Sequence, residues 1–410
     1  MTSTVTAAPP RAETWAERLW VPVSAGDEDA AAVVVREAHG SGLDAESVLL
    51  DVIGAVQRRV GAEWAANRLS VAREHAATAV NEQCVGVLRH STPPVVPAPG
   101  AGRIVVACVD GEWHGLPARL VAEVLRLRGW HVDHLGAQVP APHLIAHLHR
   151  TGADAVALSG SLAPRLPVAH ATLTACQAVG VPVLVGGAAF GYDGRYARLL
   201  GADAWAPDAR AAADRLARGP LPPPPRDHVT SADLPHLADQ EYTFVTRSRQ
   251  ELVRAVFDGL LDRYPPMREY TALQREHTAE DLEHVVVHLA TALYVDDADL
   301  FTGFLTWTAS ILSARGVPAA SLLPALAVLS ERLRDFPRAL RLLAAGTEAV
   351  REVVRGGDAG RGGDAGPGAD AGPGADAVRG ADAVRGADAV RGADMARAAE
   401  ASRTAGEDPR

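Results

Sequence analysis

The chain has 410 residues and a formal net charge of −10, with 40 Lys and Arg against 50 Asp and Glu. This acidic balance argues against a nucleic-acid-binding protein, because such proteins usually carry a basic face. The three cysteines have neither metal-site spacing nor an even number, which indicates free thiols in a reducing compartment. The start of the chain lacks a secretory signal pattern, and no apolar run is long enough to span a membrane. We therefore expect a soluble, cytoplasmic protein.

The first part of the chain has the pattern of a helical bundle. Residues 1–13 are polar and contain prolines, and we expect them to be disordered. Residues 14–90 carry apolar side chains at spacings of three and four, the period of amphipathic helices. Breaks at 40–42 and 67–70 divide this stretch, which predicts a four-helix bundle.

A Pro-rich linker at 91–102 separates the bundle from a stretch, 103–218, with a different period. Residues 104–109 form a continuous apolar run, typical of a strand that is buried on both faces. Strand and helix patterns then alternate. The other strands are expected at 131–135, 155–158, 182–185 and 204–206, and the later helices at 141–150, 166–179, 192–200 and 208–218. This alternation predicts a doubly wound, flavodoxin-like sheet of five parallel strands.

The remainder of the chain divides into a helical domain and a tail. After a second Pro-rich linker at 219–240, residues 241–354 show helical patterns only, which predicts an all-α domain of globin-like size. Residues 355–410 consist mostly of Gly, Ala, Asp and Arg, with a repeated GADAVR motif. Such a segment has too few large apolar side chains to offset its ordering entropy, so we expect a disordered tail.

The clearest motif is the loop DGEWHGLP at 110–117, directly after the first predicted strand. Loops at the carboxyl ends of strands form the ligand sites of doubly wound folds. This loop resembles the cobalt-ligating histidine loop of cobalamin-binding domains. The resemblance implies that His114 binds the cobalt, that Glu112 fixes the tautomer of that imidazole, and that Gly115 leaves room for the corrin. Glu112 stands where aspartate is commoner, and Pro117 where glycine is usual.

The same family holds the nucleotide tail of the cofactor in a slot lined by small residues. The candidates here follow the later strands and are Gly136, Ser159, Ser161, Leu162, Gly186 and Gly187. Either Ser159 or Ser161 begins the family's S-x-L pattern, so the sequence leaves open which serine contacts the tail. A histidine near a strand end is by itself more often structural. The joint spacing of the three loops favours cobalamin.

Three residues of the predicted bundle, Trp64, Glu74 and His75, resemble the cap over the adenosyl group in adenosylcobalamin-dependent light-sensing repressors. The resemblance covers residues 30–218 and implies that Trp64 shelters the adenosyl group while Glu74 and His75 hydrogen-bond the cofactor. Taken alone, the three residues also fit a core tryptophan and a polar helix face. The repressors' winged helix is missing, and Ala65 replaces the histidine that binds cobalt after photolysis. Water or His75 would take that position.

The predicted helical domain gathers histidines, aromatic residues and arginines. His284 and His288 share a helix face, being one helical turn apart. Three readings stay open for this region: a metal or haem site, a tetrapyrrole pocket, or an amphipathic helix with solvated histidines.

The order of the domains resembles that of the photocobilins, photoreceptors that pair adenosylcobalamin with biliverdin. The resemblance implies biliverdin in the helical domain. All three cysteines, the last being Cys176, precede that domain, so we expect a non-covalent bilin with arginines on its propionates. The candidate contacts are Arg247, Arg254, His284, His288, Tyr294, Trp307 and Arg315.

These resemblances predict a light sensor and not an enzyme. Light would break the cobalt–carbon bond, the bundle would shift against the sheet domain, and a homo-oligomer interface would change. The expected partners are a second copy of the chain and a downstream signalling protein, with no nucleic acid and no membrane. Two alternatives stay open: a corrinoid methyl-carrier of a cobalamin-dependent methyltransferase, and a cobalamin-bound sensor whose globin-like domain binds haem or no ligand.

Overall fold

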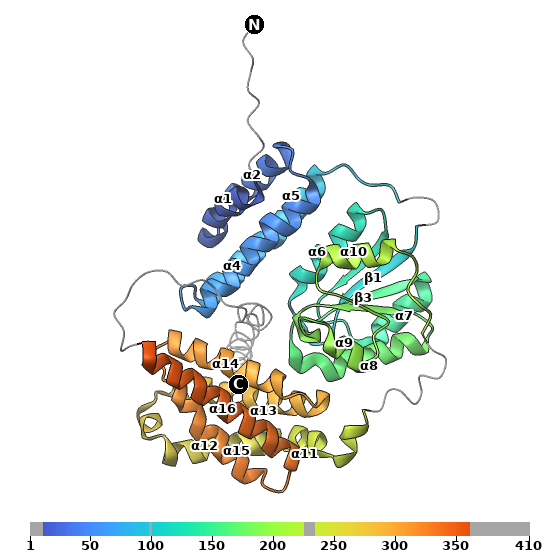
Figure 1. Cartoon of the computed structure of the whole chain (residues 1–410). Coiled ribbons are helices and arrows are strands. Elements are labelled where there is room, and N and C mark those ends of the chain that lie inside the picture. Colours follow the sequence, from blue (N-terminus) through green and yellow to red (C-terminus); the bar gives the residue numbers. More distant parts are fainter. Residues whose placement is uncertain (1–10, 98–100, 225–233, 361–410) are drawn as a thin grey trace, which may run out of the picture. The chain divides into compact units, whose positions relative to one another are not determined.

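The computed structural model describes residues 11–97, 101–224 and 234–360 (Figure 1). The chain divides into two compact units, and the boundary between them in the sequence lies between Thr92 and Pro93. The disorder predicted for the start of the chain and for the tail beyond 360 falls outside the described residues. Within them, the first helix begins at Ala12 and the last runs to Gly360. Both therefore extend into segments predicted to be disordered. In α16 the glycines near the end do not stop the helix, because a single Gly disfavours a helix by only about 1 kcal/mol.

The first unit is a set of four helical segments. They are α1 (Ala12–Ala25), α2 (Glu28–Gly40), a continuous run of α3 (Ala45–Ser47), the π-helix η1 (Val48–Ile53) and α4 (Gly54–Ala65), and finally α5 (Val71–Ser91). Asp27, Asp44 and Ser70 cap the starts of α2, α3 and α5, each accepting a hydrogen bond from a backbone N–H three residues on. The breaks predicted at 40–42 and 67–70 coincide with the ends of α2 and α4.

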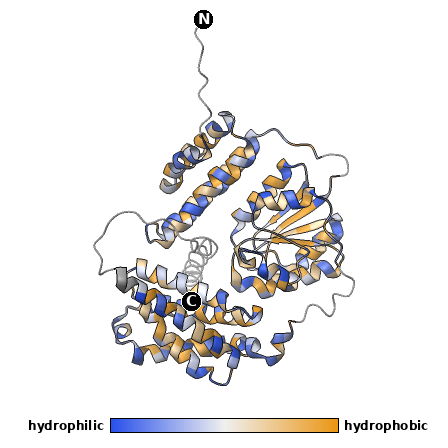
Figure 2. Cartoon of the chain, viewed as in Figure 1, coloured by the Kyte–Doolittle hydropathy of each residue, from blue (hydrophilic) through white to orange (hydrophobic). Residues whose placement is uncertain are grey.

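The second unit contains the predicted five-stranded parallel sheet, which the structure confirms. Its strands are β1 (Arg103–Cys108), β2 (His131–Gly136), β3 (Ala155–Ser159), β4 (Val183–Gly186) and β5 (Ala204–Ala206), in the order β2-β1-β3-β4-β5. One face is covered by α6 (Gly115–Leu127) and α10 (Ala209–Ala217), and the other by α7 (Ala141–Thr151), α8 (Leu166–Ala178) and α9 (Arg195–Leu199) (Figure 1). Strands β1, β3 and β4 are mostly apolar (Figure 2), as expected for strands covered on both sides, whereas the edge strand β2 carries His131, Asp133 and His134.

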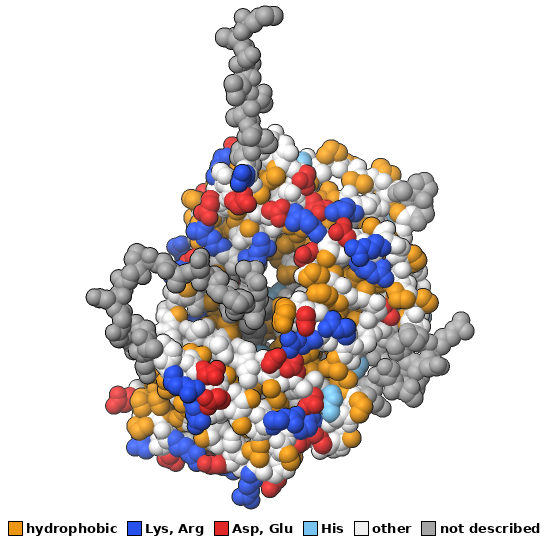
Figure 3. All heavy atoms as spheres, in the orientation of Figure 1, with side chains coloured by type: hydrophobic (Ala, Val, Ile, Leu, Met, Phe, Trp, Pro, Cys, Tyr) orange, Lys and Arg blue, Asp and Glu red, His pale blue; other side chains and the backbone are white. Residues whose placement is uncertain are grey.

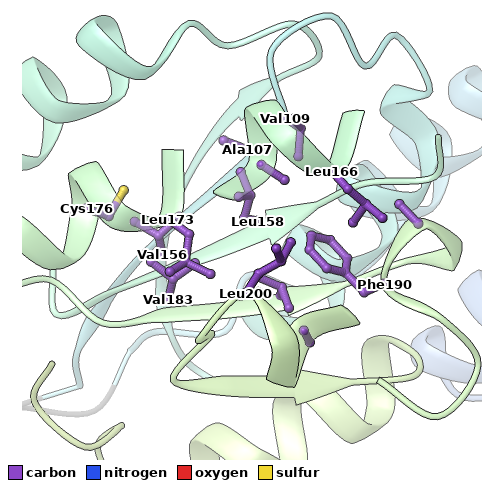
Figure 4. Close-up of a cluster of buried hydrophobic side chains, with 14 of the residues drawn as sticks. Ala107, Val109, Val156, Leu158, Leu166, Leu173, Cys176, Val183, Phe190 and Leu200 are labelled. Carbon is purple, nitrogen blue, oxygen red and sulfur yellow. The ribbon is translucent and has the colours of Figure 1, made fainter. Parts of the chain in front are cut away.

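The core of this sheet domain lies between the strands and helices α7, α8 and α9. Figure 4 shows Val156, Leu158 and Val183 of the strands meeting Leu173 and Phe190 from the helical side. Phe190 belongs to the short 3-10 helix η3 (Ala188–Phe190), and it is 1% exposed. Burial of this kind fixes the ends of the strands, and therefore the loops that follow them.

One helix of the sheet domain is shorter than predicted. The pattern at 192–200 indicated a full helix, but α9 spans only Arg195–Leu199. Gly194 adopts a left-handed backbone with φ of 72°, and a Cβ atom there would lie 2.5 Å from Trp205. The chain therefore turns tightly before α9, and the turn takes up the residues that the periodicity assigned to helix.

The described residues of the second unit from 234 to 360 form helices and the loops between them, as predicted. The elements are η5 (Pro235–Asp239), α11 (Glu241–Arg247), α12 (Arg249–Arg263), η6 (Pro265–Glu269), α13 (Ala272–Val295), α14 (Ala298–Ala314), η7 (Ala319–Ser321), α15 (Leu322–Arg332) and α16 (Pro337–Gly360). A capping box at Thr271 and Gln274 begins α13, and Asp296 ends it in a left-handed conformation. The globin-like character of this domain stays a prediction.

The end of α13 is bonded to the sheet domain. Asp297 accepts hydrogen bonds from Arg195 Nη1 at 3.1 Å and from the Tyr196 hydroxyl at 2.9 Å. The Tyr294 hydroxyl lies 2.8 Å from Nδ1 of His170 on α8, and Val295 joins the apolar cluster of the sheet domain. The helical region thus shares both polar and apolar contacts with α8 and α9.

None of the described helices combines the length and the apolar character needed to cross a lipid bilayer. On the face drawn in Figure 3, basic and acidic side chains of the described residues are interspersed over the surface.

Burial makes a direct prediction about the three thiols. Burial raises the pKa of Cys84, of Cys108 and of Cys176 to about 12, so at pH 8 each is a protonated thiol. We expect Ellman's reagent to label none of them in the native protein and all three after unfolding in urea. Rapid labelling of the folded chain would contradict this burial.

Candidate functional site

The predicted site residues of the second unit lie along one edge of the sheet. In the strand register, Ala107 of β1 pairs with Gly136, and Cys108 pairs with Ser159, which pairs in turn with Gly186. All strands are parallel, so these positions share the carboxyl edge. The chain passes from β1 to β2 on one side of β1 and then crosses to β3 on the other side. The loops after β1 and β3 therefore border the switch point where such folds bind ligands.

Glu112 is the residue that positions His114 in the loop after β1. Its Oε1 lies 3.0 Å from the backbone nitrogen of His114 and 2.5 Å from Nδ1 of the same residue. A carboxylate can only accept these bonds, so the proton of the imidazole lies on Nδ1, and Nε2 presents a lone pair. His114 keeps 18% of its side-chain surface exposed, while Glu112 is fully buried. The arrangement orients an imidazole as a metal ligand.

The same carboxylate also ties this loop to the loop after β3. Its other oxygen, Oε2, accepts hydrogen bonds from the backbone N–H groups of Ser161 at 2.7 Å and Leu162 at 2.9 Å. Burial acts to raise the pKa of Glu112, but the hydrogen bonds from His114 and from the N–H of Ser161 outweigh it and hold the pKa below its ordinary value. Glu112 is therefore an anion that joins two loops across the switch point.

Glycines permit a close approach between the loops after β3 and β4. Gly187 has φ of 99°, and a Cβ atom there would lie 2.3 Å from the carbonyl oxygen of Gly160. Gly160 in turn donates its N–H to the carbonyl of Gly186 at 3.0 Å. Gly136, with φ of 84°, has open space where a side chain would stand. Small residues thus surround this edge of the sheet.

Two residues of this site were not predicted. The Trp113 ring lies 5.4 Å from the His114 ring, and the Arg165 guanidinium lies 6.0 Å above that indole. Among the described residues, the buried Nε1 of Trp113 has no hydrogen-bond partner. Trp113 stands inside the motif and could have been noted from the sequence. Arg165 gives no sequence signal, because only the fold brings η2 (Ala163–Arg165) to this loop.

The three cap residues lie in the first unit. Trp64 shares one face of α4 with Val56 and Val60, and it is 2% exposed. Glu74 and His75 occupy the first turn of α5, where Oε2 of Glu74 lies 2.7 Å from Nδ1 of His75. The side chains of Glu74 and His75 are therefore in contact with each other.

A hydrogen-bond chain behind Glu74 escaped the sequence analysis. The Thr78 hydroxyl donates to Glu74, and Gln57 of α4 donates to Thr78. Asn81 is fully buried and donates to Gln57 at 2.7 Å. Gln57 precedes Trp64 by two helical turns on the same helix, so helical period could have indicated it. This series of hydrogen bonds connects Glu74 of α5 to α4, the helix that carries Trp64.

The predicted bilin contacts are distributed over α11, α12, α13 and α14 and the residue that follows α14. His288 is buried, stacked on Phe304 at 3.6 Å, and bonded through Nδ1 to the His284 carbonyl. Tyr294 is engaged with His170, as described above, and Trp307 is buried. Packing already uses these side chains. Arg247 is exposed at the end of α11, Arg315 bonds the Ile311 carbonyl at 3.4 Å, and Arg254 lies on α12.

Two of the open readings bear on metals. Among the described residues, no group of three or more His, Cys, Asp or Glu side chains could hold a metal ion, so His284 and His288 lack the further ligands of a metal site. A corrinoid would need fewer protein ligands, because its ring supplies four nitrogens to the cobalt, and His114 would be the residue that holds the metal. The Glu112–His114 pair and the glycine-lined edge fit that cofactor.

The comparisons with known proteins agree with this site. Residues 102–217 match a family model described as a B12 binding domain, and residues 15–89 match a second model with the same description. The two matches cover the helical first unit and the sheet domain, and they support cobalamin binding.

Among individual proteins, the chain is similar to two transcriptional repressors of Myxococcus xanthus. It is 34% identical over 183 residues to HTH-type transcriptional repressor CarA, a match that covers 43% of this chain and 59% of the relative. For HTH-type transcriptional repressor CarH the identity is 31% over 185 residues, covering 44% and 60%. The chain thus spans about three fifths of the length of these relatives.

A solved structure shows a looser likeness. The monomethylamine corrinoid protein of Methanosarcina barkeri is 17% identical, with a TM-score of 0.44, and the match covers 51% of this chain and 99% of that protein.

The role of Glu112 can be tested by Glu112→Gln. The amide keeps the shape but turns a donor toward at least one of the N–H groups that the carboxylate satisfies. We expect the free energy of unfolding to fall by about 1–3 kcal/mol. We also expect cobalamin to bind about 10–100-fold more weakly, as is usual when the partner of a metal-binding histidine is lost. Urea denaturation of the apoprotein and absorbance titration with cobalamin measure the two effects. Wild-type values in both would contradict the assignment.

Proposed function

We propose that this chain is a light-sensing protein that binds adenosylcobalamin in its base-off form through His114. Its output is a change in self-association, and it does not turn over a substrate. The observation that carries the proposal is the buried Glu112 carboxylate, which orients the His114 imidazole and anchors the loop after β3. A corrinoid that displaces its own base needs such a ligand from the protein.

The cap supports the adenosyl form of the cofactor. A B12 binding domain match covers the first unit at 15–89, and the alignments with the two Myxococcus repressors support a regulatory role. In the proposal, Trp64 lies against the adenosyl group, and the Glu74–His75 pair hydrogen-bonds the cofactor. Adenosylcobalamin supplies a cobalt–carbon bond that visible light breaks.

The cap helices are built to hold one arrangement. The chain from Asn81 through Gln57 and Thr78 to Glu74 couples α4 to α5 by side-chain hydrogen bonds. When the cobalt–carbon bond breaks and the adenosyl group leaves, Trp64 and Glu74 would lose the group that they contact. We propose that the helices then repack and change the surface offered to a second copy of the chain.

We propose further that the helical domain binds biliverdin without a covalent bond. The free cysteines of the described residues all precede that domain, since Cys176 is the last of them. A bilin would extend absorption to red light.

A second candidate function is methyl transfer. The chain is 35% identical over 94 residues to methionine synthase of Mycobacterium tuberculosis, a match that covers 22% of this chain and 8% of that enzyme. On this reading the chain is a corrinoid carrier, methylcobalamin is its bound form, and a separate methyltransferase is its partner.

The light hypothesis is tested with protein loaded with adenosylcobalamin and biliverdin in the dark. We expect green light to change the cobalamin absorbance and to shift the elution volume on size-exclusion chromatography. Trp64→Ala should bind adenosylcobalamin more weakly, whereas Trp64→Phe should retain most of the affinity because an aromatic ring remains. A methyl-carrier would give no far-red band, and haem would give a Soret band. If illumination leaves absorbance and elution both unchanged, the proposal is wrong.

Cobalt ligation is tested with His114→Ala. We expect loss of the base-off, histidine-ligated spectrum and cobalamin affinity lower by at least about tenfold, because the axial imidazole is removed. His143→Ala is a matched control, since His143 is an exposed histidine on α7 of the same domain. Equal binding and colour in the two variants would overturn the assignment of His114.

A further inference from the structure

The helical domain contains an arginine-lined cleft that the sequence analysis did not identify. It lies between α12 and α13 and has a volume of about 500 Å³, within the range of small-molecule sites. Its lining residues are Arg249, Gln250, Val253, Arg254, Phe257, Arg275, Glu276, Ala279 and Glu283. We call these residues the α12–α13 cleft.

The charges of the cleft are not balanced internally. Arg249 forms an ion pair with Glu283 at 3.3 Å. Arg275 donates to the carbonyl oxygen of Arg268 at 3.1 Å, and it has no carboxylate partner among the described residues. Arg254 makes no hydrogen bond or ion pair within the described part of the chain. Glu276 also lines the cleft, so three arginines face two glutamates and the cleft keeps a net charge of +1. The guanidinium groups of Arg254 and Arg275, one from each helix, can therefore meet an anion.

The surface between the two arginines is apolar. Phe257 and Val253 are half-buried on α12, and Ala279 is half-buried on α13. An aromatic ring with two small or branched neighbours suits a flat, conjugated body. Guanidinium groups suit carboxylates, because their planar donors match both oxygens. The cleft therefore combines the two features that an amphipathic dicarboxylate requires.

We propose that the α12–α13 cleft binds the carboxylate-bearing edge of the helical domain's ligand, an amphipathic molecule with two carboxylates and a flat apolar body. This inference rests on the proposed function, in which that ligand is biliverdin. Arg254 and Arg275 bind one carboxylate each, and the pyrrole plane lies against Phe257. The site differs from the predicted group of His284, His288, Tyr294 and Trp307. In that group His288 and Trp307 are buried, and Tyr294 contacts His170 of α8.

The test is an absorbance titration of biliverdin into the full-length, cobalamin-loaded protein. We expect Arg254→Gln and Arg275→Gln each to weaken binding on the order of tenfold, because each removes a charge-assisted hydrogen bond at an exposed position. Arg334→Gln is the matched control. Arg334 is an exposed arginine of the same domain, and its nearest carboxylate, that of Asp335, lies 3.7 Å away.

A second probe separates charge from shape. Biliverdin dimethyl ester keeps the conjugated body but lacks the carboxylates. It should bind the wild type more weakly than biliverdin, and the arginine substitutions should leave its affinity unchanged. Added salt should weaken biliverdin and spare the ester. Unchanged cobalamin spectra and melting temperatures show that the variants are folded.

The outcomes distinguish this inference from the proposed function. If biliverdin binds the wild type and both cleft variants equally, or if Arg334→Gln is weakened as much as they are, the cleft assignment is wrong and the bilin proposal stands. If the cobalamin-loaded wild type binds no biliverdin, the bilin part of the proposed function fails and this inference fails with it. The assignment of cobalamin to His114 is unaffected in either case.

Discussion

The arrangement of the candidate site depends on one buried carboxylate. Removing a carboxylate from water is costly unless its oxygens find donors. Glu112 meets this requirement with four N–H groups, two from His114 and one each from Ser161 and Leu162. The bonds that stabilise the charge also set the tautomer of His114 and hold the loops after β1 and β3 together. The hydrogen bonds to Glu112 therefore both set the geometry of the site and stabilise the two loops.

This edge of the sheet is continuous with the helical domain. The loop that Glu112 anchors leads directly into η2, and α13 packs against both η2 and α8. Beyond β4, Arg195 and Tyr196 bond Asp297 at the end of α13. The loops after β3 and β4 thus both lead to segments that contact α13. The edge that carries Glu112 and His114 is therefore joined to the helical domain through packed elements.

The cap uses a similar device on a smaller scale. A buried amide, Asn81, begins a chain of hydrogen bonds that reaches Glu74 and His75. Such networks hold side chains in one orientation when all their members are satisfied. The side-chain amide oxygen of Asn81, Oδ1, has no hydrogen-bond partner within the described residues. At its buried end the network therefore leaves one hydrogen-bond acceptor unpaired.

Much of the fold was predictable from local pattern, because a parallel sheet covered on both faces needs continuous apolar strands, and bundle helices need apolar residues at helical period. The strands and the helical regions were identified in this way, and the loop of Glu112 and His114 was identified by its resemblance to the cobalamin-binding motif. Contacts between residues distant in the chain were not. Arg165 beside Trp113, the short α9 and the α12–α13 cleft exist only because separate elements pack together. Local sequence determined which elements form and which side chains can bind a metal, whereas tertiary packing decided which of them meet, because that depends on long-range contacts that no periodicity records.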